Sequence, residues 1–151
     1  LFYRLNCYLY SLIYYFRFFM KIRQLRPSDT KQVIDIWTSS FSRNFSNTLN
    51  PGYPNDPNST TMVVCEGNTI IGVASIHVIY KLSRTLGLIE DVAVNKDLRG
   101  KGIGKSLVKK LIEIGKQKNC DKIVLNTSEK NSKFYEKIGF EKNEIQMVIR
   151  N

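Results

Sequence analysis

With 151 residues, the chain has the size of one domain that can bury a substantial hydrophobic core. Its 23 Lys and Arg residues against 13 Asp and Glu residues give a formal net charge of +10, which favours anionic partners such as nucleic acids, membrane surfaces or phosphorylated small molecules. The basic residues are scattered and do not alternate with aromatic residues as in RNA-binding motifs, so nucleic-acid binding is a minor hypothesis and we expect no nucleic-acid partner.

The first nineteen residues differ in composition from the rest of the chain, because they are rich in aromatic residues and leucine and carry only Arg4 and Arg17 as charges. The apolar run Leu5–Phe16 is shorter than the roughly 18 residues that span a bilayer, and no small-residue cleavage site of a signal peptide follows it. We therefore expect residues 1–19 to be an extension outside the fold and residues 20–151 to form a single domain. The alternative is an anchor at a membrane surface, and membrane contact is expected only in that case.

The domain is predicted to begin with a strand in Met20–Pro27 and a helix that starts at Pro27-Ser28-Asp29. The stripe that this helix would bury consists of Val33, Ile36, Trp37 and Ser40. The segment Ser42–Pro57 is rich in Ser, Asn and Pro and predicts a long loop, and loops of this length often cover a substrate.

Three antiparallel strands are predicted next. Thr61–Glu66 and Thr69–Ile79 flank Gly67-Asn68, a pair that favours a tight turn, so they should form a hairpin. The third strand, Leu86–Val94, carries the adjacent acids Glu90 and Asp91 and leads directly into a glycine-rich loop.

The loop Arg99-Gly-Lys-Gly-Ile-Gly104 opens a predicted helix that runs to about Lys118, because apolar residues recur at Ile103, Leu107, Leu111 and Ile114. Exposed amides and the positive end of the helix dipole would make its start a phosphate cradle, to which Arg99, Lys101 and Lys105 add charge. The spacing R-x-x-G-x-G matches neither a P-loop nor a dinucleotide fingerprint. A glycine-rich turn into an ordinary helix is the structural alternative.

The last third of the chain predicts a strand, a helix and a strand. The continuous apolar run Lys122–Asn126 is typical of a central strand that is buried on both faces. Asn131 is expected to cap a brief helix over Ser132–Ile138, and the alternating segment Ile145–Arg150 predicts a final strand. The order of elements therefore predicts an α+β fold, with a mixed central sheet and helices on both faces.

Cysteine and histidine offer no pattern for a disulfide framework or a metal site. The three cysteines, Cys7, Cys65 and Cys120, are odd in number, far apart and without C-x-x-C spacing, so we expect no zinc or other metal and a reducing, cytoplasmic location. His77 is the only histidine and falls in a predicted strand. We expect it to have a packing or surface role, which argues against a Ser-His-Asp mechanism.

The glycine-rich loop after a strand with adjacent acids resembles the coenzyme A pyrophosphate loop of the GNAT acyltransferase superfamily, and the order of elements over 20–151 is similar to the GNAT fold. The stretches that narrow this resemblance to the glucosamine-6-phosphate N-acetyltransferases are Gly87–Val94, Arg99–Lys105, Asn119–Lys122, Glu129–Asn131, Phe134–Phe140 and Gln146–Arg150. The resemblance implies an enzyme that moves an acetyl group from acetyl-CoA to the amine of D-glucosamine 6-phosphate, in the biosynthesis of UDP-N-acetylglucosamine.

The resemblance also implies roles for individual residues. Glu90 and Asp91 would hold the sugar amine while it loses its proton, and Tyr135 would protonate the departing thiolate. The positions that correspond to cofactor-binding residues are Val92, Ala93, Val94, Arg99, Gly100, Lys101, Gly102, Ile103, Gly104, Lys105, Asn131 and Tyr135. The positions that correspond to substrate-binding residues are Lys81, Glu90, Asp91, Asp121, Lys122, Asn126 and Arg150. A homodimer is implied as well, in which the last strand is exchanged and Arg150 comes from the second subunit.

One departure from the family pattern bears on the substrate. Where the family commonly has an acid after the buried strand, this chain has Asn126, which can bind sugar hydroxyls but carries no charge. Two alternatives therefore stay open: a GNAT acetyltransferase that acts on another small amine or a protein amino group, and a non-catalytic module that binds acyl-CoA or nucleic acid.

Overall fold

The computed structural model describes residues 20–41, 45, 50, 52–53 and 56–149. The N-terminal extension expected over 1–19, most of the expected loop Ser42–Pro57, and Arg150 lie outside the described residues. The regular elements are β1 (Met20–Gln24), a 3-10 helix (Pro27–Asp29), α2 (Thr30–Phe41), β2 (Ser59–Glu66), β3 (Thr69–Tyr80), β4 (Thr85–Val94), a second 3-10 helix (Lys96–Leu98), α3 (Ile103–Gln117), β5 (Lys122–Leu125) and α4 (Glu129–Glu136).

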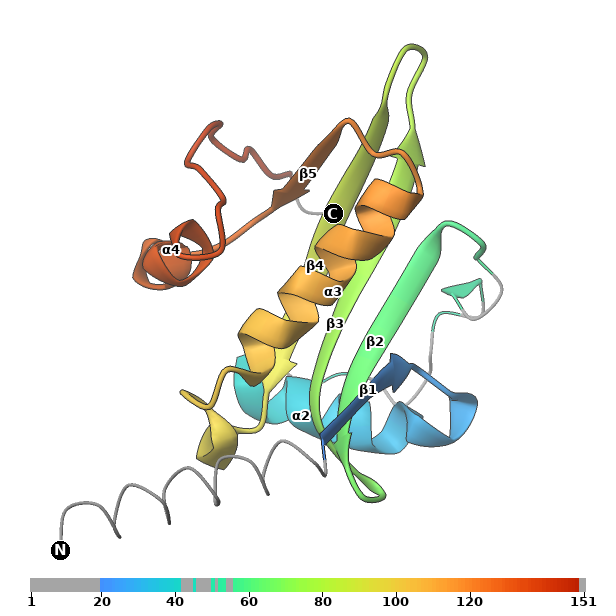
Figure 1. Ribbon diagram of the computed structural model, residues 1–151, viewed down its shortest axis with the longest axis vertical. Coiled ribbons are helices and arrows are strands. Elements are labelled where there is room, and N and C mark those ends of the chain that lie inside the picture. Colours follow the sequence, from blue (N-terminus) through green and yellow to red (C-terminus); the bar gives the residue numbers. More distant parts are fainter. Residues whose placement is uncertain (1–19, 42–44, 46–49, 51, 54–55, 150–151) are drawn as a thin grey trace, which may run out of the picture.

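The strands form one mixed sheet in the order β1-β2-β3-β4-β5 (Figure 1). The pairs β1–β2, β2–β3 and β3–β4 are antiparallel, whereas β5 runs parallel to β4. Helix α3 is the crossover between β4 and β5. The predicted hairpin around Gly67-Asn68 and the predicted α+β sheet with helices are therefore confirmed.

Helices cover both faces of the sheet because the side chains of each strand alternate between the faces. On one face, Met62 and Val64 of β2 belong to the same buried cluster as Leu107 and Leu111 of α3. On the other face, the neighbouring Val63 and Cys65 belong to a second buried cluster, with Val33 and Ile36 of α2. The predicted stripe of α3 is thus its buried face, although Ile114 at its end is only half-buried.

Helix α3 approaches the sheet closely where it carries Gly115. A Cβ at this position would lie 2.7 Å from Cδ1 of Ile123 on β5, closer than real Cβ contacts allow without a shift of the isoleucine. The glycine therefore lets α3 and β5 pack directly against each other.

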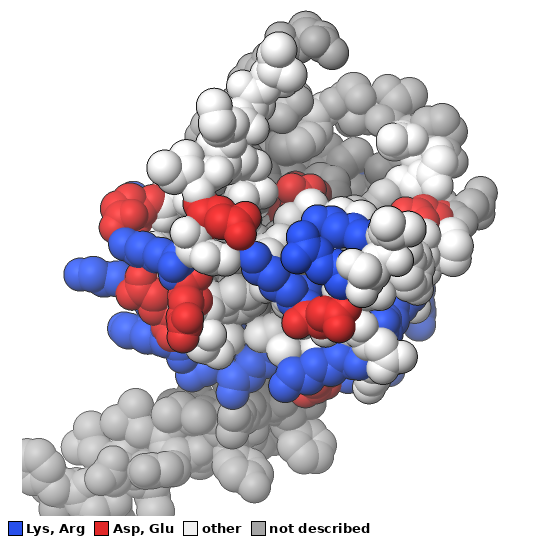
Figure 2. Space-filling view, turned by 90° about the horizontal axis from the view of Figure 1, so that it is seen from above, with Lys and Arg blue, Asp and Glu red and all other residues white. Residues whose placement is uncertain are grey.

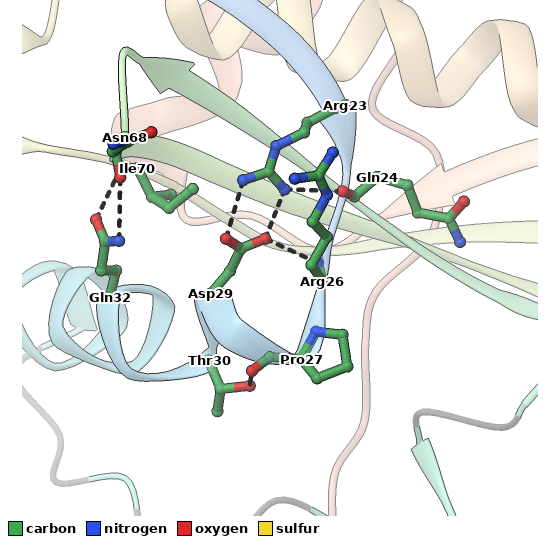
Figure 3. A network of polar contacts seen from close by, with 9 residues as sticks. All are labelled: Arg23, Gln24, Arg26, Pro27, Asp29, Thr30, Gln32, Asn68 and Ile70. Carbon is green, nitrogen blue, oxygen red and sulfur yellow. Dashed lines mark hydrogen bonds and ion pairs between the residues drawn. The ribbon is translucent and has the colours of Figure 1, made fainter.

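Polar contacts fix the first half of α2 to the sheet (Figure 3). The carboxylate of Asp29, which is 5% exposed, accepts hydrogen bonds from Nη1 and Nη2 of Arg23 at 2.5 and 2.9 Å and from the N–H of Arg26 at 2.8 Å. The hydrogen bonds from Arg23 hold the pKa of the Asp29 carboxyl below its usual value. One turn further, the side-chain amide of Gln32 donates to the carbonyl of Asn68 and accepts from the N–H of Ile70 at the β2–β3 turn.

The C-terminal part differs from the prediction at three points. Helix α4 begins at Glu129 with Ser128 as its N-cap, so Asn131 lies inside the helix and does not cap it. Strand β5 is at the edge of the sheet and its side chains are at most half-buried, so it is not a central strand within one chain.

The predicted last strand is also wrong for the single chain, because residues 141–149 have no regular secondary structure. A strand needs a neighbouring strand to bond its backbone, and this segment is paired with no strand of the described sheet. Its alternating apolar side chains, Ile145, Met147 and Ile149, are therefore more than 90% exposed.

The surface carries both signs of charge. Figure 2 shows one end of the molecule, where Lys and Arg side chains lie between Asp and Glu side chains, so the net positive charge does not form a continuous patch on this face. Within the described ranges, no helix has the length and apolar character needed to cross a membrane.

Candidate active site

Strand β4 carries its two adjacent carboxylates at a β-bulge. The pairing of β3 with β4 shifts between Val73 and Ser75, where β4 contains one residue more than β3. Asp91 takes up the extra length with a φ of 55°, in the left-handed region that residues other than glycine rarely adopt. Its carbonyl accepts a hydrogen bond of 3.2 Å from Nε1 of Trp37 on α2. The side chains of Glu90 and Asp91 are both exposed at this bend of the strand.

One edge of β4 is open beyond the bulge. The parallel pairing with β5 ends at Ile89 and Leu125, so β4 continues to Val94 without a partner strand on that side among the described residues. The carbonyl of Val94 accepts a hydrogen bond of 3.2 Å from Nε of Arg99 and faces this edge. Because backbone groups alternate between the two edges of a strand, those of Val92 face the open edge as well. These groups can bind an extended ligand that takes the place of a strand.

A cavity of about 460 Å³ lies beside this part of β4. It brings together six of the residues that the resemblance assigned to a site, namely Glu90, Asp91, Val92, Asn126, Asn131 and Tyr135. They come from β4, from the loop after β5 and from α4. Phe41 and Phe45 form an apolar part of the wall. Among the described residues of the lining, Glu90 and Asp91 are the only charged ones, so this part of the cavity suits a cationic or amine-bearing ligand.

Tyr135 extends from α4 into this cavity, between two aromatic rings. Its ring lies edge-on to those of Phe134 and Phe140, at centroid distances of 4.9 and 6.0 Å. Burial raises the pKa of the Tyr135 phenol above its usual value, because the charged phenolate would be poorly solvated there. The residue is therefore a proton donor at neutral pH.

The glycine-rich loop follows β4 directly and has the geometry of an anion cradle. Gly100 and Gly102 have φ angles of 80° and 83°, and no atom lies within 4 Å of the place where a Cβ would be at either residue. The first helical hydrogen bond of α3 runs from the N–H of Ser106 to the carbonyl of Gly102, so the three preceding amides have no acceptor within the helix. Phe134 lies over the start of the helix, 3.3 Å from the Cβ position of Gly104, and so connects this loop to α4.

Three of the residues assigned to the substrate do not lie at this cavity, and a fourth is not described. Lys81 is in the β3–β4 turn, and the carboxylate of Asp121 accepts a hydrogen bond from the N–H of Thr85, which is a structural contact. Lys122 lies 3.3 Å from the carboxylate of Glu144. Lys81 and Lys122 line an adjoining cavity of about 990 Å³, between β5 and the C-terminal segment, which shares Asn126 and Tyr135 with the first cavity. The fourth residue, Arg150, is outside the described part of the chain.

Arg99 has a different environment from the one the sequence suggested. In addition to the bond from its Nε to Val94, its Nη2 donates to Oγ of Ser40 on α2 over 3.3 Å. Two of its nitrogens are therefore engaged with the protein, and it joins α2 to the end of β4.

Sequence reasoning missed the aromatic side of the site. Trp37 was expected only as part of a buried stripe, and Phe41 and Phe45 received no role. No local pattern could have found them, since their contacts with the site join segments about fifty residues apart in the chain.

As for metals, the described residues contain no group of three or more His, Cys, Asp and Glu side chains that could hold an ion.

Comparison with known proteins gives a family and several relatives. The model of the acetyltransferase (GNAT) family matches residues 24–140. The chain is 45% identical over 94 residues to glucosamine 6-phosphate N-acetyltransferase of Trypanosoma brucei brucei, a match that covers 59% of this chain and 64% of that protein. It is 45% identical over 85 residues to glucosamine 6-phosphate N-acetyltransferase 1 of Dictyostelium discoideum, which covers 54% of each chain. The matches thus span less than two thirds of these curated relatives.

A solved structure matches over a greater length. The crystal structure of glucosamine-6-phosphate N-acetyltransferase from Arabidopsis thaliana superimposes with a TM-score of 0.77 and 27% sequence identity. The match covers 87% of this chain and 97% of that one. The similarity therefore extends over most of the fold.

Proposed function

Because the chain belongs to the acetyltransferase (GNAT) family, we propose that it transfers the acetyl group of acetyl-CoA to the amine of glucosamine 6-phosphate. The observation that carries this proposal is the cavity in which Glu90, Asp91, Asn126 and Tyr135 meet beside the open edge of β4. The relatives named above add the substrate, since two of them are glucosamine 6-phosphate N-acetyltransferases that are 45% identical to this chain over the matched residues.

Glu90 and Asp91 suit the first step, in which a sugar ammonium becomes a free amine. An amino-sugar nitrogen beside hydroxyls should titrate near the α-amino range of about 7.7 to 8.0, so a weak base is sufficient at neutral pH. A carboxylate attracts the ammonium form, and the proton leaves to that carboxylate or to water. The nitrogen lone pair then attacks the thioester carbonyl carbon.

Tyr135 suits the second step, in which the carbon–sulfur bond breaks and the coenzyme A sulfur leaves with the electron pair. The conjugate acid of a thiolate has a pKa of about 8.5, and a phenol held beside the sulfur can supply the proton. The nitrogen loses its second proton as the amide forms, and this proton restores the phenol, directly or through water. Because burial raises the pKa of Tyr135, the phenol keeps its proton through the neutral range.

Acetyl-CoA fits the loop that follows β4. The amides of Ile103, Gly104 and Lys105 have no acceptor within α3, and the dipole of this 15-residue helix favours an anion at its start. The open space beside Gly100 and Gly102 would admit a pyrophosphate. The open edge of β4 can bond the amides of the pantetheine arm, which would bring the acetyl group towards Tyr135.

The phosphate of the substrate needs cations, and no Lys or Arg belongs to the described part of the lining of this cavity. We propose that a second copy of the chain supplies them, with the C-terminal segment exchanged between subunits and Arg150 at the phosphate. Support comes from the outer edge of β5, which pairs with no strand among the described residues, and from the exposure of Ile145, Met147 and Ile149. Exposed apolar residues with strand alternation suit a partner sheet.

The two acids of the described lining favour a second candidate, a GNAT acetyltransferase for an unphosphorylated amine. An acidic, partly aromatic cavity would accept a polyamine or the amino group of a peptide without any contribution from a second subunit.

Coenzyme A release can separate these candidates. The protein would be mixed with acetyl-CoA and, in parallel, with glucosamine 6-phosphate, glucosamine, spermidine or a lysine peptide, and the products identified by mass. We expect the largest kcat/KM for glucosamine 6-phosphate. A larger value for spermidine or the peptide would replace the proposed substrate, and no coenzyme A release with any amine would remove the proposed activity.

A further inference from the structure

We propose that Trp37 is a positioning residue, whose indole N–H holds the bulge of β4 and thereby sets the orientation of the two acids. This inference rests on the proposed acetyl transfer. The bond runs from Nε1 of Trp37 to the carbonyl of Asp91 over 3.2 Å. It therefore reaches the one residue of β4 whose backbone lies in the left-handed region.

The bulge needs an external contact because the sheet alone does not define it. Asp91 falls in the register shift between β3 and β4, and β5 has already ended on the other side. An aspartate at a φ of 55° has left the favoured regions of backbone conformation, so its geometry persists only when its surroundings hold it. The indole N–H supplies such a contact at the residue that carries one of the two site carboxylates.

Helix α2 can act as a fixed support for this contact. Val33 and Ile36 of this helix are buried against the sheet and hold it in place. At its far end, Ser40 accepts a hydrogen bond from Arg99, which also binds the carbonyl of Val94. Helix α2 thus holds the open segment of β4 at both of its ends, directly at Asp91 and through Arg99 at Val94.

The packing role of the Trp37 ring can be separated from the role of its N–H. The ring packs against the buried cluster below α2 and lies 5.7 Å from the ring of Phe45. A phenylalanine keeps an aromatic ring in this place but removes the donor together with one ring of the indole, so the Tm of Trp37→Phe is measured beside its kcat to separate the hydrogen bond from the packing.

The matched control is Gln32→Leu, which removes two backbone hydrogen bonds from the same helix at a distance from β4. We expect Trp37→Phe to lower kcat about 3- to 10-fold, the usual effect of one hydrogen bond, while the Kd for coenzyme A changes by less than about twofold. Gln32→Leu should lower the Tm and leave kcat within about twofold of the wild type. An unchanged kcat in Trp37→Phe, or equal losses of kcat in both variants, would overturn the positioning role.

A second measurement does not depend on the amine acceptor. Trp37 is the only tryptophan of the chain, so the protein gives a single indole N–H signal in a ¹H–¹⁵N spectrum. Coenzyme A bound along β4 should shift this signal, because the indole is bonded to the same segment. A signal unmoved by saturating coenzyme A would refute the proposal. If the wild type shows this shift but prefers another amine, the proposed substrate fails, and the comparison of kcat is made with that amine.

Discussion

Replacement of Tyr135 by phenylalanine tests the chemistry of the site most directly. The ring contacts with Phe134 and Phe140 remain in this variant, and only the hydroxyl in the cavity is lost. A phenol has an ordinary pKa of about 10 and the thiol of coenzyme A one of about 8.5, so proton transfer is uphill by at least about 2 kcal/mol before the carbon–sulfur bond weakens. We therefore expect a contribution at the lower end for general acids, about 100-fold in kcat, or about 2.7 kcal/mol.

The assay is coenzyme A release under saturation with both substrates, over a range of pH. Because the pKa of the Tyr135 phenol is raised, the wild-type kcat should fall only at a pH above the ordinary phenol value, and this alkaline limb should vanish in Tyr135→Phe. Tyr80→Phe is the matched control, since Tyr80 is 64% exposed at the end of β3 and is not part of the cavity lining. A kcat for Tyr135→Phe within about twofold of the wild type would refute the acid role.

Three further variants test the cofactor loop, the phosphate site and the fold. Gly102→Val should raise the KM for acetyl-CoA far more than that for the sugar, because its φ of 83° disfavours a branched side chain and a Cβ would enter the anion cradle; equal rises would contradict this. Arg150→Ala should leave the protein dimeric by light scattering and weaken the binding of glucosamine 6-phosphate by about 1.5 to 3 kcal/mol, while the binding of glucosamine changes little. A monomeric wild type would rule out the shared site. Asp29→Asn should lower the free energy of unfolding by about 2 to 3 kcal/mol, since it breaks a buried, doubly bonded pair with Arg23. Folding lowers the pKa of Asp29, so the wild type keeps this contribution to stability above about pH 4 and loses it at lower pH. Denaturant titrations over this pH range should show the loss in the wild type and not in Asp29→Asn.

Local patterns were enough to predict most elements of this fold. The spacing of Ile103, Leu107 and Leu111 defined the buried face of α3, and the Gly67-Asn68 turn defined the β2–β3 hairpin. The position of β5 could not be predicted in the same way, because an apolar run does not reveal whether another strand will pair with its outer edge. The prediction of a final strand over Ile145–Arg150 was wrong for the same reason, since no strand of the described sheet pairs with this segment.

The site needed more than local patterns. Glu90, Asn126 and Tyr135 come from three different elements, and only the family resemblance placed them in one cavity before the structure did. The bulge at Asp91 and its bond from Trp37 left no signal in the sequence, because strand bulges depend on register and the two residues lie 54 positions apart.

The short pairing between β4 and β5 has a consequence for heat inactivation. The carboxylates belong to β4, whereas Tyr135 follows β5, and only four residue pairs join these strands. The distance between the carboxylates and Tyr135 therefore depends on the packing of α3 on β5 at Gly115 more than on hydrogen bonds between β4 and β5. Local opening of such a short ladder requires less free energy than unfolding of the four antiparallel strands. On gradual heating, enzymatic activity should consequently decline several degrees before the circular dichroism of the whole sheet changes, and coincident transitions would contradict this view of the molecule.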